Sequence, residues 1–278
     1  MQRDEPAKGF TLIELLVVIA IIGVLAAMLL PALSRAKQQA QGVQCISNLR
    51  QLHLAWETYS NDHGGRFPSN HGDGSAARPG GLPSWVGGWL DYRTDNPDNT
   101  NSFLLVDPKV NGGMGEYVGN PGVFKCPSDK SWAINGAQRY NRVRSYSMNF
   151  HVGPTHSGIS ADGFWLYFRA SDFGQPQPSQ LLLFVEEHED SIGGSAFVNL
   201  LGDLERGFLT ALPSGRHNGA NPISYADGHV EMHKWQDERT RKPVEHKTFY
   251  GMWSFDNPDI EWLKERMSAR RPMPGYPN

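Results

Sequence analysis

The sequence predicts an α+β fold in which one long N-terminal helix packs on an antiparallel β-sheet with long glycine-rich loops. The helix is predicted by an apolar run that passes directly into a run with helical periodicity and ends near Asp62. The sheet is predicted by the density of turn-forming residues, because 27 of the 30 glycines and 17 of the 19 prolines follow residue 62. Such spacing is typical of short strands and turns.

The overall composition excludes several classes of protein. The chain has 278 residues, a formal net charge of -3, 39% hydrophobic residues and two cysteines. Disordered chains, collagens and disulfide scaffolds have other compositions. A nucleic-acid binder needs a basic excess that this chain lacks, so no nucleic-acid partner is expected. The length allows one large domain or two small ones.

The first element is the apolar segment 10–33, whose only charged residue is Glu14. As a helix its 24 residues would span about 36 Å, enough for a hydrocarbon core of about 30 Å. A removable secretory signal cut near Ser34, a buried core helix and a retained transmembrane anchor are the alternatives. The length and the acid disfavour the signal, and the apolar character on all sides disfavours a core helix.

The residues around the start of this segment resemble a known signal. The stretch KGFTLIEL, from Lys8 to Leu15, is similar to the class III signal of type IV prepilins and type II secretion pseudopilins. In that family a prepilin peptidase cuts after the glycine and methylates the new N-terminal phenylalanine. The resemblance therefore implies a cleaved leader at 1–9, processing at Gly9 and Phe10, and retention of the helix at 10–33.

The same resemblance implies a pilin-like fold and a structural role. The expected function is a subunit of a type II secretion pseudopilus or a type IV pilus-like filament, homo- or hetero-oligomeric. The implied partners are other pilin or pseudopilin subunits and an inner-membrane assembly platform. Before assembly the chain would cross the inner membrane once through residues 10–33, with a head at 63–278 in the periplasm or outside the cell.

Glu14 and Pro31 are the expected assembly residues. A carboxylate about one turn inside an apolar segment is costly in lipid unless it is paired. Cleavage would create an ammonium on Phe10, and the resemblance implies that Glu14 pairs with this group on a neighbouring subunit. The alternative is a Glu14 solvated at the headgroup level. Pro31 removes a helical hydrogen bond, and either a kink formed on assembly or a tolerated kink at the membrane boundary accounts for it.

The next element, at 34–62, is predicted to be an amphipathic stem helix continuous with the first. Gly64 and Gly65 end it. The apolar residues recur at three- and four-residue spacing. They are Ala36, Ala40, Val43, Ile46, Leu49, Leu52, Trp56 and Tyr59.

Three further motifs resemble those of a large subfamily of prepilin-like proteins. They are C-x-x-N-L-R-Q-L from Cys45, F-x-C-P-S-D from Phe124, and H-x9-D-G from His217 to Gly228. Asp227 and Gly228 are expected to form a two-residue type I′ hairpin turn, and His217 to hydrogen-bond nearby loop backbone.

The implied topology places both cysteines outside the cytoplasm, where disulfides persist. A Cys45–Cys126 bridge is expected, with two free thiols as the alternative. Its loop of about 80 residues would stabilise the fold by roughly 4 kcal/mol through the unfolded state. A Cα separation beyond about 7 Å would exclude it.

The head is predicted from its alternating or apolar runs. Strands are expected at 145–150, 164–169, 180–186, 196–201, 222–226 and 229–235. A final helix is expected from Pro258 to about Ala269, with Asn257 as its cap. The segment 64–122 has weak periodicity and is interpreted as a surface insertion.

No cofactor is expected, although two metal sites are considered. On a strand His229, Glu231 and His233 would share one face, with His217 upstream, but neighbours on a face lie nearly 7 Å apart and such alternation is typical of any half-exposed strand. Calcium could bind oxygens at 256–259 or 95–101, where the same residue types serve more often as turn and cap residues.

Two other classes of function are considered. A pilin-like stem could display a surface binding module, for example for carbohydrate, through Trp85, Trp89, Trp132 and Trp165. Such aromatic residues more often pack a loop-rich core. An enzyme is not expected, because the sequence has no nucleophile motif, phosphate-binding loop or H-E-x-x-H helix.

Overall fold

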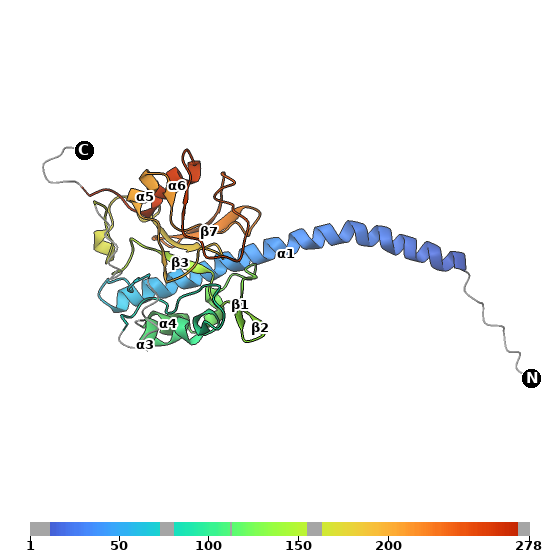
Figure 1. Cartoon of the computed structure of the whole chain (residues 1–278), viewed down its shortest axis with the longest axis horizontal. Coiled ribbons are helices and arrows are strands. Elements are labelled where there is room, and N and C mark those ends of the chain that lie inside the picture. Colours follow the sequence, from blue (N-terminus) through green and yellow to red (C-terminus); the bar gives the residue numbers. More distant parts are fainter. Residues whose placement is uncertain (1–11, 73–80, 112, 155–162, 272–278) are drawn as a thin grey trace, which may run out of the picture. The chain divides into compact units, whose positions relative to one another are not determined.

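The computed structural model describes residues 12–72, 81–111, 113–154 and 163–271. It divides into two compact units, Met1–Gln41 and Gly42–Asn278. Helix α1 (Leu12–Asp62) belongs to both and includes Pro31 without interruption (Figure 1). The predicted continuity of the two helical segments and the predicted end at Asp62 are therefore confirmed.

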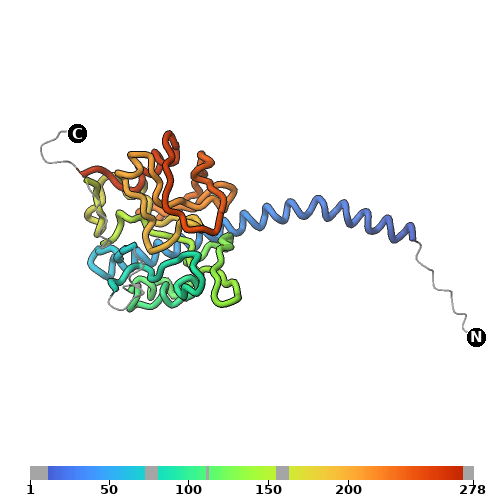
Figure 2. Tube along the Cα trace, viewed as in Figure 1, coloured from blue at the N-terminus to red at the C-terminus, as the bar shows by residue number. Residues whose placement is uncertain are grey.

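The second unit contains α1 from Gly42 onward, a central sheet and several short elements, whose path is traced in Figure 2. The strands are β1 (Trp132–Asn135), β2 (Gln138–Asn141), β3 (Tyr146–Asn149), β4 (Leu182–Glu186), β5 (Ala196–Phe197), β6 (Phe208–Leu209), β7 (Ala220–Tyr225), β8 (Val230–Lys234) and β9 (Met252–Trp253). The short α-helices are α2 (Phe103–Val106), α3 (Pro108–Asn111), α4 (Met114–Val118), α5 (Leu201–Glu205) and α6 (Pro258–Met267). Single 3-10 turns are η2 (Pro97–Asn99), η3 (Pro121–Phe124) and η4 (Ala170–Asp172).

The central sheet has the strand order β5-β3-β4-β7-β8. Its pairs are antiparallel except β3 with β5, which is parallel. β1 with β2 and β6 with β9 form separate two-stranded ribbons. The α+β prediction is confirmed. The runs at 145–150, 180–186 and 229–235 contain β3, β4 and β8, and the run at 222–226 overlaps β7, which begins two residues earlier.

Two of the expected strands differ from the structure. The run 164–169 makes isolated bridges, including Phe164 with Arg270 and Tyr167 with Val152. The run 196–201 contributes only the two-residue β5, since Leu201 already begins α5. In both places only some of the apolar side chains are buried, including Phe164 and Tyr167 in one run and Phe197 and Leu201 in the other, and they pack in the core without a continuous ladder of hydrogen bonds.

The sheet separates two apolar clusters. The cluster on one face includes Leu49 and Leu52 of α1 with Met148 and Phe184 of the sheet. The cluster on the other face includes Val185 and Ile223 of the sheet with residues of α5 and α6. In Figure 1, accordingly, β7 lies between α1 and α6. The stem helix is thus a core element of the second unit.

The segment 64–122 is not a surface insertion, and this prediction is wrong. Trp85, Leu105 and Met114 are buried in the cluster that contains α1. Figure 1 shows α3 and α4 on the side of α1 away from β7. Periodicity is weak here because each helical turn is too short to repeat a pattern and buries at most two of its described residues.

The C-terminal helix follows the sequence prediction closely. Asn257 accepts a hydrogen bond from the Asp259 backbone N–H, and Pro258 occupies the first turn. The side-chain oxygen satisfies a helix donor that would otherwise have no partner, and proline lacks the donor altogether. α6 ends at Met267, two residues before the expected end.

Candidate functional site

The N-terminal part of α1 presents an apolar surface. Leu12, Leu16 and Ile22 are each more than half exposed. The helix is long and apolar enough to cross a membrane, and no residue of its most apolar stretch is buried within the chain. Glu14 lies in its first turn. Gly9 and Phe10, the expected processing residues, lie outside the described residues.

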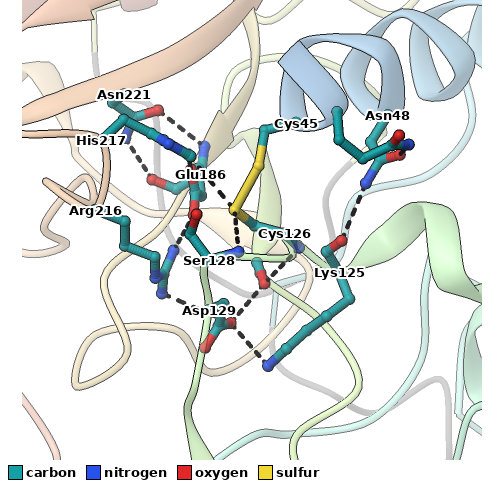
Figure 3. Close-up of a disulfide and its surroundings, with 12 residues drawn as sticks. Cys45, Asn48, Lys125, Cys126, Ser128, Asp129, Glu186, Arg216, His217 and Asn221 are labelled. Carbon is teal, nitrogen blue, oxygen red and sulfur yellow. Dashed lines mark hydrogen bonds and ion pairs between the residues drawn. A yellow bond between two sulfur atoms is a disulfide. The ribbon is translucent and has the colours of Figure 1, made fainter. Parts of the chain in front are cut away.

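The second candidate site is a polar cluster around a disulfide. Cys45 and Cys126 are bonded, with their Cα atoms 5.4 Å apart and both side chains buried. Figure 3 shows the bond joining α1 to the loop that follows η3. The expected bridge is therefore present, and its Cα separation is within the range for a disulfide.

The three-residue spacing of Cys45 and Asn48 in the C-x-x-N motif is explained by the contacts of α1 with the Cys126 loop. Asn48 lies three residues after Cys45, on the same face of α1. Its Nδ2 donates to the carbonyl oxygen of Lys125 over 3.0 Å. The disulfide and this hydrogen bond therefore hold two consecutive residues of the same loop against one face of the helix.

Asp129 organises the F-x-C-P-S-D loop from within. Its carboxylate accepts hydrogen bonds from the Ser131 backbone N–H at 2.7 Å and the Ser145 hydroxyl at 2.5 Å. Lys125 lies 2.9 Å away. Burial by itself would raise the pKa of Asp129, but attraction to Arg216 and Lys125 outweighs it and lowers the pKa. The acid is charged and part of a paired network.

Arg216 connects this loop to the C-terminal end of β4, the middle strand of the sheet. Its guanidinium contacts Glu186 at 2.5 Å, Glu189 at 2.9 Å and Asp129 at 3.7 Å. Burial opposes the charged form, but these three carboxylates raise the pKa of Arg216. The arginine is a neighbour of the H-x9-D-G motif, and no pattern in the sequence singled it out.

His217 contacts side chains and not loop backbone. Its Nε2 lies 3.2 Å from Glu186 Oε2 and 3.5 Å from Cys126 Sγ. The expectation that its ring hydrogen-bonds nearby loop backbone is wrong. The turn before β7 places the ring over the disulfide, and these partners are 31 and 91 residues away in sequence. Figure 3 shows the ring directed toward both groups.

The spacing of H-x9-D-G matches the length of β7. At one end of the strand, the ring of His217 approaches the position where Gly42 would carry a side chain. At the other end, Gly228 approaches His53. Eleven helical residues span about 16 Å, which is similar to a six-residue strand of about 20 Å that lies along them. The motif therefore places both ends of β7 on α1.

The hairpin turn is longer than predicted. The Tyr225 N–H donates to the His229 carbonyl, and the Gly228 N–H to the Tyr225 carbonyl. Only Gly228 of the turn has positive φ, at 94°. A type I′ turn needs positive φ at both central residues, which is unfavourable for Asp227, so the chain forms a three-residue turn with a glycine bulge. Asp227 accepts hydrogen bonds from the backbone and ring of His229.

The ligands considered at 229–233, with His229 just before β8 and Glu231 and His233 within it, have separate partners. His229 pairs with Asp227 at 2.6 Å. Glu231 accepts a hydrogen bond from the Tyr225 hydroxyl, and His233 stacks on Trp262. The structure does not bring these three side chains together around one point.

The oxygens considered for calcium serve as turn and cap acceptors. Asp259 accepts from the backbone N–H groups of Gln236 and Asp237. In the segment 95–101, Asp98 accepts from the Trp89 N–H and Asp95 from the Gly136 N–H. These contacts favour the structural alternative, and calcium binding stays a prediction that calorimetry on the chain can test.

The tryptophans considered for surface binding are mostly packed. Trp85 is fully buried, and Trp165 is 41% exposed. Trp89 and Trp132 are partly buried. Trp89 lines a cavity of about 420 Å³ with Tyr92, Phe249 and Glu187. Burial raises the pKa of Glu187 to about 7. The four tryptophans form no exposed coplanar platform.

These features define a class of protein: a filament-type subunit with an apolar N-terminal helix whose second half is a core element of a disulfide-linked α+β unit. Residues 6–30 match the family model described as the prokaryotic N-terminal methylation motif. The chain belongs to the pilin and pseudopilin family.

The sequence similarity of this chain to two of its relatives covers more than twice the length of α1. The type II secretion system core protein G of Klebsiella pneumoniae is 41% identical over 142 residues, which are 48% of this chain and 98% of that protein. Its namesake in Escherichia coli K12 is 31% identical over 117 residues, 40% of this chain and 80% of that protein. The type IV major pilin protein PilE1 of Neisseria gonorrhoeae is 42% identical over 72 residues, 26% of this chain and 43% of that protein. No solved structure matches.

Proposed function

We propose that this pilin-like subunit is cleaved after Gly9, methylated on Phe10 and assembled through α1 into a type II secretion pseudopilus or a related type IV pilus-like filament. The observation that carries the proposal is the apolar, exposed surface of α1 from Leu12 to Leu33, with Glu14 as its only acid. The relatives are secretion-system core proteins and pilins, which are structural subunits, and this fits a chain that is not an enzyme.

Membrane insertion precedes assembly in this proposal. The helix crosses the inner membrane once, and the unit from Gly42 onward is in the periplasm or outside the cell. A prepilin peptidase removes the leader on the cytoplasmic side, and an inner-membrane platform adds the subunit to the filament. The disulfide supports this placement, because such bonds persist outside the cytoplasm.

Glu14 sets the axial position of each subunit in this proposal. Cleavage creates an ammonium on Phe10 of one subunit, and Glu14 of its neighbour supplies the opposite charge. In a low-dielectric environment such a pair is far stronger than in water. The acid therefore acts during assembly and has no part in folding of the second unit.

Substitution of Glu14 tests this role. Glu14→Gln should reduce the recovery of sheared filaments at least tenfold, while the amount of subunit in the membrane is unchanged. Glu14→Asp, which keeps the charge, should retain most assembly. N-terminal sequencing and mass spectrometry of wild-type filaments should find a methylated Phe10. Normal filament yield with Glu14→Gln would exclude the pairing, and an N-terminus at Met1 would exclude the processing.

A further inference from the structure

Four buried or nearly buried side chains around the disulfide carry the atoms that zinc prefers. They are the sulfurs of Cys45 and Cys126, the imidazole of His217 and the carboxylate of Glu186, and the ligand atoms all lie within 4.8 Å of one another. Figure 3 shows them converging from α1, the loop after η3, the end of β4 and the turn before β7. Thiolate, imidazole and carboxylate are the ligands of tetrahedral zinc sites.

The spacing of these atoms matches a tetrahedron of zinc ligands. Zinc bonds of about 2.3 Å to sulfur and about 2.0 Å to nitrogen or oxygen give ligand separations of roughly 3.5 Å for sulfur to nitrogen and 3.3 Å for nitrogen to oxygen. The Cys126 Sγ to His217 Nε2 distance is 3.5 Å, and the His217 Nε2 to Glu186 Oε2 distance is 3.2 Å. His217 is therefore at ligand spacing from both neighbours.

Residues around the four side chains would orient the ligand atoms and offset part of their negative charge. Arg216 holds Oε1 of Glu186 at 2.5 Å, and Oε2 faces His217. The Ser128 N–H donates to Cys126 Sγ over 3.4 Å. Such contacts orient ligands and stabilise their charge. Two thiolates and one carboxylate carry three negative charges. Zn²⁺ would balance two of them, and Arg216, which also contacts Glu189 and Asp129, lies beside the carboxylate of Glu186.

We propose that the reduced chain binds one Zn²⁺ ion through Cys45, Cys126, Glu186 and His217, and that the zinc-bound and disulfide forms are mutually exclusive. The two sulfurs would move apart to about 3.8 Å, the separation of two sulfurs in such a tetrahedron. Either form joins α1 to the loop after η3. The zinc form adds β4 and the turn before β7 to the same link and protects the thiolates before the bond forms.

Conversion of the zinc form into the disulfide form is an oxidation, and a second disulfide can act as the oxidant. Oxidised glutathione accepts two electrons from the two zinc-bound thiolates and takes up two protons, which gives two glutathione thiols. The Cys45–Cys126 bond forms through a mixed disulfide, and Zn²⁺ leaves because disulfide sulfurs are poor ligands. Reduction by two thiols reverses the reaction and restores the site.

Cobalt titration of the full chain in detergent tests the proposal. The chain is reduced with a phosphine under argon and titrated with Co²⁺, followed by Zn²⁺. We expect one equivalent of Co²⁺ with the visible bands of tetrahedral coordination and a thiolate-to-cobalt charge-transfer band, both removed by one equivalent of Zn²⁺. The oxidised chain should give neither band. Oxidised glutathione should release one equivalent of zinc from the loaded chain.

Matched variants identify the ligands. Cys45→Ser/Cys126→Ser should abolish the charge-transfer band, while His217→Ala and Glu186→Gln should each weaken Co²⁺ binding at least about tenfold. His229→Ala is the control, because this histidine belongs to the D-G-H turn and pairs with Asp227 outside the cluster. Zinc-edge X-ray absorption of the loaded wild type requires no variant and should show two sulfurs and two nitrogen or oxygen ligands.

Three results would overturn the proposal. One is reduced, folded wild-type chain that takes up no Co²⁺ in stoichiometric amount. Another is binding that survives loss of both cysteines, or that depends on His229 and not on His217. The third is an absorption spectrum without sulfur in the first coordination shell.

Discussion

Asp129 shows how one residue can stabilise a loop that has almost no secondary structure. Its carboxylate accepts hydrogen bonds from Ser131 and Ser145 and pairs with Lys125 and Arg216. A buried charge is tolerated when it is both paired and hydrogen-bonded, and loss of one partner leaves the others uncompensated. The loop that carries Cys126 therefore depends on an acid that never reaches solvent.

Replacement of Asp129 by Asn should destabilise the chain strongly. Lys125 and Arg216 would remain buried with less negative charge around them, and the free energy of unfolding should fall by about 3–5 kcal/mol. Urea denaturation followed by tryptophan fluorescence measures the change. Asp237→Asn, which removes an acid paired with the more exposed Arg239, is the control and should have a much smaller effect. Equal losses in both variants would contradict the buried network.

His151 should make the fold sensitive to acid. It is fully buried, and burial lowers its pKa from 6.5 to about 3. Between these values the unfolded chain binds a proton that the native chain does not bind, so the free energy of unfolding falls as pH decreases from 6.5 to 3. The contribution is on the order of 4 kcal/mol.

The measurement is the free energy of unfolding at pH 7 and pH 4 in wild type and in His151→Gln. The glutamine variant does not titrate and should lose less stability over this interval than wild type, even if it is less stable at pH 7. A pH dependence that is the same in both chains would show that other groups cause the acid sensitivity.

At the scale of elements, β7 and α1 fit together because both ends of the strand contact the helix. His217 approaches Gly42 at one end, and Gly228 approaches His53 at the other. The hairpin glycine is required twice, because its φ is positive and because a Cβ there would lie 2.9 Å from His53 Nε2. The conformation of the turn and the packing against α1 therefore both require glycine at position 228.

Gly228→Ala should therefore lower the stability more than a glycine substitution that meets only the first requirement. Gly136, in the β1–β2 turn, has φ of 60° and open space where its Cβ would lie. Gly136→Ala should cost about 1 kcal/mol, and Gly228→Ala at least about twice as much. Thermal unfolding followed by circular dichroism compares the two. Equal shifts in melting temperature would mean that contact with His53 adds nothing.

At the scale of the whole molecule, α1 serves two environments. Its first part presents apolar side chains, and its second part is buried in the core of the unit that begins at Gly42. Both apolar clusters and the disulfide belong to that unit. The division predicts that the two parts can be separated experimentally.

A chain of residues 42–278, exported to the periplasm, should fold and remain soluble. Full-length protein should partition into the membrane fraction, since its apolar helix has no other place to be buried. Fractionation and size-exclusion chromatography make the comparison, with detergent needed only for the full chain. Membrane association of the shorter chain would show that the second unit contributes its own membrane contacts.

The sequence by itself determined the elements whose signals are local. The apolar run with Glu14, the three- and four-residue spacing up to Asp62, the Asn257 cap and the strands β3, β4, β7 and β8 were predicted because each depends on neighbours within a few residues. The short strands β1, β2, β6 and β9 were not predicted. The disulfide was expected from the topology that the N-terminal signal implied. The segment 64–122 and the type of turn at Asp227 were not predicted, because burial by distant elements and the sign of φ outweighed local patterns.

Only the tertiary structure decided how the chemical groups are combined. Arg216 and His217 both contact Glu186, and His217 also contacts the disulfide sulfur of Cys126, because the turn before β7 lies against the end of β4 and against α1. Contacts over 30 to 91 residues leave no periodic trace in the sequence. The apparent ligand row at 229–233 was separated because each side chain has its own partner: His229 pairs with Asp227 within the turn, Glu231 accepts from Tyr225 of β7, and His233 stacks on Trp262 of α6. Local sequence determines which element forms, whereas the packing of elements determines which side chains meet.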